Sequence, residues 1–165
     1  MTTQHIDPMQ FRQVLGSWPS GVVVISAMVD GKPVGMSVNS FTSVSLDPPL
    51  VGFFPARSSS TWPVLRSSGR FCVSVLASHH EEVSRLFSRK DIDRFAEISW
   101  HERAGGPGID EAVAWIDCEL DEEFETGDHL LALGRVISMD ADDSVVPLIF
   151  HRGKYASGPS QPAGA

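Results

Sequence analysis

The segment Arg57-Ser58-Ser59-Ser60-Thr61 is the part of this sequence best suited to bind an anion. It combines a guanidinium group with four hydroxyls, directly before residues that have the composition of a helix. Backbone amides, hydroxyls and the helix dipole would converge there on a phosphate group. A plain serine-rich helix cap explains the same residues, so both interpretations stay open.

A second unusual segment spans residues 35–45, where small polar residues occupy nearly every other position. A strand of this kind leaves room for a flat molecule against its backbone, and its hydroxyls and amides can hydrogen-bond the edge of a heteroaromatic ring. The simpler interpretation is an edge strand with a polar outer face.

Gly127-Asp128-His129 lies between two strand-like segments and has the composition of a turn. A single histidine in a turn is usually just exposed. Alternatively, His129 places a hydrogen-bond donor over a bound anionic nucleotide.

Motifs of several common catalytic classes are absent from the sequence. There is no G-x-G-x-x-G after a strand, no phosphate-binding G-x-x-x-x-G-K-[ST] and no G-x-S-x-G. No cysteines or histidines have zinc-site spacing, so we expect no metal. The adjacent His79 and His80 are predicted to be exposed, in the first turn of a helix, and to project in different directions.

Length and composition limit the remaining possibilities. The 165 residues suffice for one domain with a substantial core, and the net charge of −8 without a basic stripe argues against a nucleic-acid partner. No apolar run approaches the length of a membrane helix, and no export signal is visible at the N-terminus. Cys72 and Cys118 lie within apolar runs, so we expect reduced, buried thiols in a cytoplasmic protein.

Local patterns indicate the elements that must position these residues. A capped amphipathic helix is expected from Asp7-Pro8, and Asp30-Gly31 predicts a hairpin turn. Ser78 to Glu81 has the spacing of a capping box ahead of another helix. A further short helix is expected over 58–66, capped by Ser60 or Thr61. Strands are expected at 21–29, 33–46, 50–54, 71–76, 112–124, 130–138 and 146–150.

The strand predicted over 112–124 has an acidic row on one face, formed by Asp117, Glu119, Asp121 and Glu123. A solvated strand face is the simplest interpretation, and a hard-metal site is the lesser one.

Six or seven strands with about three short helices favour a mainly β fold, an antiparallel split or closed barrel with peripheral helices. One domain is expected over residues 1–155. Residues 156–165 are small, polar and proline-bearing, and they are expected to form a disordered tail.

Taken together, five motifs resemble the flavin reductase-like family of the FMN-binding split-barrel superfamily. They are FRQVLGSWPSGVVVIS (11–26), GMSVNSFTSVSLDPPLV (35–51), DRF (93–95), GDH (127–129) and PLIFHRGKY (147–155). Each is weak alone, but their order and spacing are specific, and they span nearly the whole chain.

The resemblance implies two groups of site residues. The flavin would contact Met36, Ser37, Val38, Asn39, Ser40, Thr42, Ser43, Arg57, Ser58, Ser59, Ser60, Thr61, Ser88, Arg94 and Phe95. The nicotinamide nucleotide would contact His129, His151, Arg152, Gly153 and Tyr155.

The resemblance also implies an activity: NADH reduces an exchangeable FAD or FMN, and a separate monooxygenase uses the reduced flavin. NADPH is less favoured, because basic residues for a second phosphate are few. Hydride transfer between two cofactors needs positioning rather than a catalytic side chain. The alternatives are a protein that holds FMN tightly without turnover and an inert structural barrel. A homodimer is expected, because a split barrel leaves an apolar flank to cover.

Overall fold

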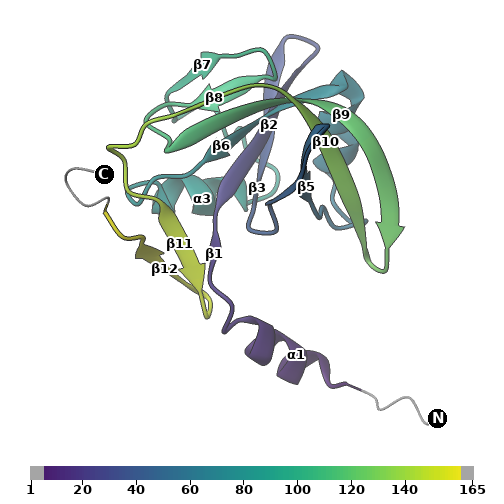
Figure 1. Cartoon of the computed structure of the whole chain (residues 1–165), viewed down its shortest axis with the longest axis vertical. Coiled ribbons are helices and arrows are strands. Elements are labelled where there is room, and N and C mark those ends of the chain that lie inside the picture. The colour runs from purple at the N-terminus through teal and green to yellow at the C-terminus, as the bar shows by residue number, and fades with distance from the viewer. Residues whose placement is uncertain (1–5, 161–165) are drawn as a thin grey trace.

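The computed structural model describes residues 6–160 (Figure 1). The helices are α1 (Pro8–Leu15), α2 (Trp62–Leu65) and α3 (Glu81–Phe87), with a short 3-10 helix, η1, at Arg66–Ser68. The strands are β1 (Ser20–Gly21), β2 (Val23–Val29), β3 (Lys32–Val38), β4 (Thr42–Leu46), β5 (Pro49–Phe53), β6 (Arg70–Val75), β7 (Trp100–Glu102), β8 (Pro107–Ile109), β9 (Ala114–Thr126), β10 (His129–Ala141), β11 (Leu148–His151) and β12 (Lys154–Ser157).

Seven of these strands form one antiparallel sheet in the order β3-β2-β6-β9-β10-β5-β4. The sheet curls strongly, as Figure 1 shows. Strands β3 and β4 follow each other in the chain but lie at the two ends of this order, so the barrel is split between them. This confirms the predicted mainly β split barrel with three helices.

The predicted strand over 33–46 is therefore wrong in one respect, because it is two strands rather than one. The chain leaves the sheet between Val38 and Thr42. There the Ser40 hydroxyl accepts a hydrogen bond from the Phe54 amide, and Phe41 packs against the core. These two contacts turn the chain from one edge of the barrel to the other.

Two local predictions are confirmed in detail. Asp7 caps α1 by accepting from the amides of Met9 and Gln10. Asp30 and Gly31 both have positive φ, 49° and 74°, and this is the backbone that a two-residue hairpin between β2 and β3 requires.

The core has two layers, because β2 is buried on both faces. Ile25 faces the barrel interior with Phe53, Trp62 and Phe71. The opposite face, with Val24, packs beneath α3 in a second cluster that includes Phe87, Ile109 and Leu148. The edge-on contacts of Phe53 with Trp62 and Phe71, at centroid distances of 5.1 and 5.5 Å, add specificity to the interior packing.

Both cysteines are free and buried, as the sequence predicts. Burial raises the pKa of each thiol to about 12. The thiolate form that would react with oxidants or metals is therefore scarce at neutral pH.

Two predictions near α3 are wrong. The helix begins at the expected place, but its N-cap is His80 and no side chain caps it, so the capping box does not form. His79 and His80 precede the helix rather than occupying its first turn. Their rings consequently lie on the same side, with centroids 4.2 Å apart, and His80 is buried rather than exposed.

The C-terminal strands β11 and β12 form a smaller sheet with β1, in the order β1-β11-β12. Ala156 and Ser157 are expected from the sequence to lie in a disordered tail. In the structure they belong to strand β12, because both pair with β11. Residues 161–165 of that tail lie outside the described residues. Among residues 6–160, no helix is long and apolar enough to cross a membrane.

Candidate functional site

A hollow of about 180 Å³ lies where β3, α3 and β12 meet. Its lining includes Ser37, Val38, Asn39 and Ser88 from the predicted flavin group and Tyr155 from the predicted nicotinamide group. The structure thus brings parts of both groups together. The hollow is smaller than a usual ligand pocket, so only part of a flavin-sized molecule would lie inside it.

A chain of three hydroxyls joins the walls of this hollow. The Ser84 Oγ of α3 lies 3.2 Å from the Ser37 Oγ of β3 and 2.8 Å from the Tyr155 Oη of β12. The Arg85 guanidinium stacks over the Tyr155 ring, 4.9 Å from its centroid. These contacts fix the relative positions of the three elements.

Sequence reasoning missed Ser84, which is almost fully buried at the centre of this chain of hydroxyls. The available signal was its spacing: Ser84 and Ser88 are one helical turn apart and therefore lie on the same face of the helix.

A second group of predicted residues meets beside the β9–β10 turn. The Arg57 amide donates to the Asp128 carbonyl at 2.9 Å, and Ala56 pairs with His129 as an isolated bridge. The Arg57 guanidinium lies 3.5 Å from a carboxylate oxygen of Glu125. The predicted phosphate segment and the GDH turn are therefore neighbours.

His129 is oriented by its neighbour in this turn. Its Nδ1 lies 2.7 Å from Asp128 Oδ1, and this hydrogen bond lowers the pKa of the Asp128 carboxyl. The second ring nitrogen, Nε2, stays available to a ligand because the ring is partly exposed.

The phosphate segment differs from its prediction in how its helix begins. Helix α2 has only four residues, so its dipole is short, and the Ser59 hydroxyl rather than Ser60 or Thr61 accepts from the Trp62 amide. Arg57, Ser58 and Ser60 are exposed. Anion binding there would depend on the guanidinium and the exposed hydroxyls.

Arg94 and Phe95 are directed inward. Arg94 donates to the Gly35 carbonyl at 2.6 Å and to Thr61 Oγ1 at 3.1 Å, and burial lowers the pKa of its guanidinium. Phe95 is buried against Phe87 in the second core cluster. Both residues therefore contact β3 at Gly35.

The remaining predicted residues are spread over the molecule. Met36 packs against the barrel interior, and Thr42 and Ser43 are exposed on β4. Arg152 and Gly153 form the β11–β12 turn beside α1, where the Arg152 amide donates to the Gly16 carbonyl, and His151 ends β11. Figure 1 shows this turn and the β9–β10 turn at opposite sides of the chain, so a single chain does not bring His129 to His151.

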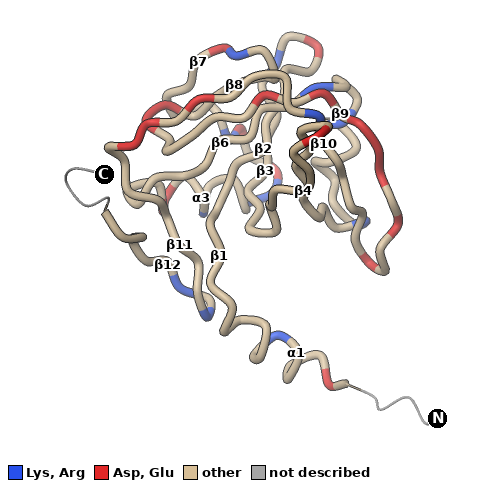
Figure 2. The backbone as a smooth tube through the Cα atoms, in the orientation of Figure 1, with Lys and Arg blue, Asp and Glu red and all other residues tan. Residues whose placement is uncertain are grey.

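The charge distribution around the β9–β10 turn is mainly acidic. Figure 2 shows Asp and Glu residues along β9 and around its turn with β10. Arg57 is a basic residue that reaches this turn, where its guanidinium also donates to the Gly127 carbonyl at 3.5 Å. An anionic ligand at the turn would therefore depend strongly on Arg57.

The chain is similar to known proteins along nearly its whole length. A family model described as the flavin reductase-like domain matches residues 15–159. The chain belongs to this family. A flavin reductase of Pseudomonas putida is 46% identical over 152 residues, covering 91% of this chain and 89% of the relative. HsaB, the reductase subunit of a flavin-dependent monooxygenase from Rhodococcus jostii, is 42% identical over 94% of this chain and 80% of its own.

Flavin reductases of known structure share the same fold. The NADH:FAD oxidoreductase SgcE6 of Streptomyces globisporus, solved with NAD and FAD fragments, superposes with a TM-score of 0.87 at 33% identity, covering 99% of this chain and 100% of that one. The family resemblance inferred from the motifs is confirmed, and this flavin reductase is an NAD(P)H:flavin oxidoreductase that uses a flavin and a nicotinamide cofactor.

Proposed function

We propose that the protein uses NADH to reduce free FAD or FMN and that the reduced flavin serves a separate monooxygenase. The observation that carries this proposal is the hollow where Ser37 to Asn39 and Ser88 meet Tyr155. Among the relatives, HsaB supports the proposal, because it is the reductase subunit of a flavin-dependent monooxygenase. The cofactors supply the chemistry, a hydride passing from nicotinamide C4 to flavin N5.

The protein's own contribution is binding and orientation. Small residues along β3 leave the flavin ring access to backbone amides, and donors near its pyrimidine edge would stabilise the charge that reduction creates. Arg57 with Ser58 and Ser60 offers donors for a phosphate, and His129 offers Nε2 to the nicotinamide nucleotide.

The test is NADH oxidation by the purified protein with FAD or FMN added in turn. Turnover that rises with added flavin supports a reductase with an exchangeable flavin, and the ratio of the two rates gives the preference. Replacing NADH by NADPH tests the nicotinamide preference. A yellow flavin retained through gel filtration without turnover would instead indicate a protein that only holds FMN.

Replacing His129 by alanine is expected to raise KM for NADH about tenfold while kcat changes less than about threefold. The reason is that His129 would help to bind the nucleotide and takes no part in the hydride step. Steady-state kinetics at saturating flavin measure both constants. Glu122→Gln, an exposed change on the same hairpin, is the control. A variant that lowers kcat at unchanged KM would contradict this placement of His129.

We further propose a homodimer. Strand β4 is an edge of the sheet and exposes Val44 and Leu46, while β10 exposes Ile137 and Met139. Apolar surface of this kind commonly marks a protein interface. A monomer in sedimentation at micromolar concentration would remove this proposal.

We also propose that the protein is cytoplasmic, because the thiols of Cys72 and Cys118 are reduced. Cell fractionation would test this localisation.

A further inference from the structure

A second hollow, of about 640 Å³, lies apart from the residues assigned to the cofactors. It is bounded by the start of α3, by β7 and by the loop between β8 and β9. The side chains that could bind a cation there are those of His79, His80, Glu97, His101, Asp110 and Glu111. Of these, His101 and Asp110 already pair with each other, since His101 Nδ1 lies 2.7 Å from Asp110 Oδ1.

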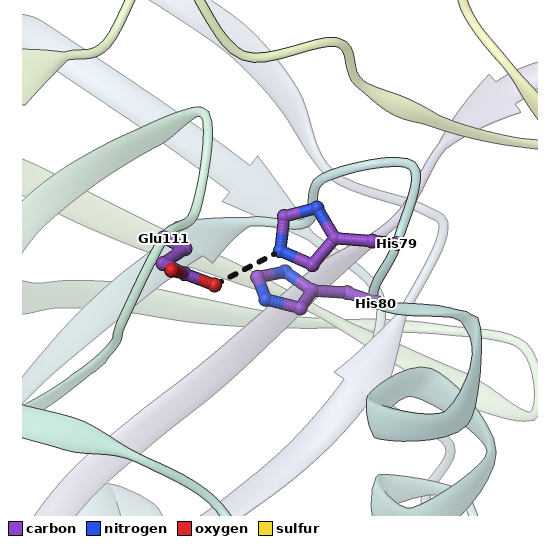
Figure 3. A group of neighbouring side chains, drawn as sticks. All are labelled: His79, His80 and Glu111. Atoms are coloured by element: carbon purple, nitrogen blue, oxygen red, sulfur yellow. Dashed lines mark ion pairs between the residues drawn. The ribbon is translucent and has the colours of Figure 1, made fainter.

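Three of these side chains converge, as Figure 3 shows. His79 Nε2 lies 3.4 Å from Glu111 Oε2. One ligand atom from each of His79, His80 and Glu111 lies within 4.8 Å of the other two. Within residues 6–160, this is the only such group of three or more His, Cys, Asp or Glu side chains.

The spacing matches what a small transition-metal ion needs. Two atoms that each lie about 2.1 Å from a tetrahedral zinc ion are about 3.4 Å apart, which is the separation of His79 Nε2 and Glu111 Oε2. The third atom, from His80, lies within 4.8 Å of the other two, so this buried side chain would have to shift to reach the same ion. Two histidines with one glutamate are a common zinc ligand set, and they leave the fourth position open to the hollow.

The backbone conformation of Glu111 is a further unusual feature of this group. Its φ is 58°, in the left-handed region that residues other than glycine seldom adopt. In this conformation the Glu111 carboxylate lies beside His79, although α3 and the loop after β8 are about thirty residues apart in sequence.

We propose that His79, His80 and Glu111 bind a divalent transition-metal ion, with zinc as the chemically matched ion. The ion would tie the start of α3 to the loop between β8 and β9. Because α3 carries Ser84 and is followed directly by Ser88, the site would stabilise one wall of the cofactor hollow without touching the cofactors. The ion would therefore take no part in the hydride step, and its expected effect is on the stability of the fold.

One contact sets the strength of binding. The Ala77 amide donates to His80 Nδ1 at 3.2 Å, so the neutral ring carries its proton on Nε2. Coordination through Nε2 moves this proton to Nδ1 and breaks the bond from Ala77. Losing one such hydrogen bond is expected to weaken zinc binding by about tenfold relative to a site in which no such bond has to break.

The experiment uses the full, untagged chain after EDTA treatment and dialysis, titrated with zinc chloride at neutral pH in a calorimeter. One zinc ion per chain is expected, with an increase in Tm of about 5 °C at a hundredfold excess of zinc over Kd. His79→Ala and Glu111→Gln each alter an exposed residue, so the fold should survive. Each is expected to weaken binding by at least tenfold.

The control is Glu82→Gln, which removes an exposed carboxylate from the first turn of α3. Glu82 is not one of the three proposed ligands. It is expected to bind zinc as the unaltered chain does. Cobalt gives a second readout, because a tetrahedral cobalt site absorbs strongly in the visible region and His79→Ala should abolish the band. The proposal is overturned if zinc does not bind stoichiometrically, or if His79→Ala and Glu111→Gln bind it as tightly as Glu82→Gln.

Discussion

Replacing Asp117 by alanine is expected to lower the free energy of unfolding by about 3–5 kcal/mol. The Asp117 side chain is almost fully buried and accepts three hydrogen bonds. They come from Arg103 Nη2 at 3.0 Å, the Gly105 amide at 3.0 Å and the Ser138 hydroxyl at 2.7 Å. Alanine leaves these donors without their acceptor and leaves a largely buried guanidinium without one of its two carboxylates.

Urea unfolding of the two proteins measures this loss, and Asp121→Ala is the matched control. Asp121 lies on the same strand and pairs with Arg135 at 2.9 Å, but its residue is exposed. An exposed ion pair contributes less than about 1 kcal/mol, so the control should change stability little. Equal losses in the two variants would show that the buried network does not stabilise the fold as argued.

Asp117 also shows where sequence reasoning reaches its limit. Period-two alternation on β9 correctly places Glu119 and Asp121 on the face away from the core, where each pairs with an arginine. The prediction is wrong for Glu123, because a β-bulge between Leu120 and Glu123 reverses the alternation. Glu123 therefore shares a face with the buried Ala132 and accepts a hydrogen bond from Trp62 Nε1 at 2.7 Å. Alternation assigns Asp117 to that same solvated face. It cannot show that the chain around Arg103 to Gly106 returns to cover this end of the strand.

The barrel itself was predictable because its signals are local. The β2–β3 hairpin follows from Asp30-Gly31, and β6 and β9 follow from short apolar or alternating runs. The split between β3 and β4 was not predictable, since nothing within 33–46 marks an interruption. That break depends on contacts from Ser40 and Phe41 to distant parts of the chain.

The candidate site was predicted as a set of motifs, and the structure shows that the residues of these motifs lie in separate places. Ser37 and Tyr155 share one hollow, while Arg57 and His129 share another place beside the β9–β10 turn. Arg94 is expected to contact the flavin, and in this structure its guanidinium donates to the Gly35 carbonyl. Motif order therefore identifies the segments of the site, whereas the direction of each side chain depends on packing that a sequence pattern does not contain.

A substitution at Gly105 is expected to be at least as damaging as the one at Asp117, for a purely steric reason. A Cβ atom at Gly105 would lie 2.2 Å from the Phe71 carbonyl oxygen and 2.9 Å from the Cys72 amide nitrogen. Both atoms belong to the backbone of β6, which is paired on both sides, with β2 and with β9. Neither neighbour can move aside without breaking the sheet.

Gly105→Ala is therefore expected to destabilise the fold by more than about 3 kcal/mol, measured by thermal or urea unfolding. Gly21→Ala is the control, because a Cβ there meets nothing within 4 Å. It should leave stability within about 0.5 kcal/mol of the unaltered chain. If Gly105→Ala unfolds like Gly21→Ala, the loop over β6 must be able to lift away, and the buried bond from the Gly105 amide to Asp117 could then not hold that loop in place.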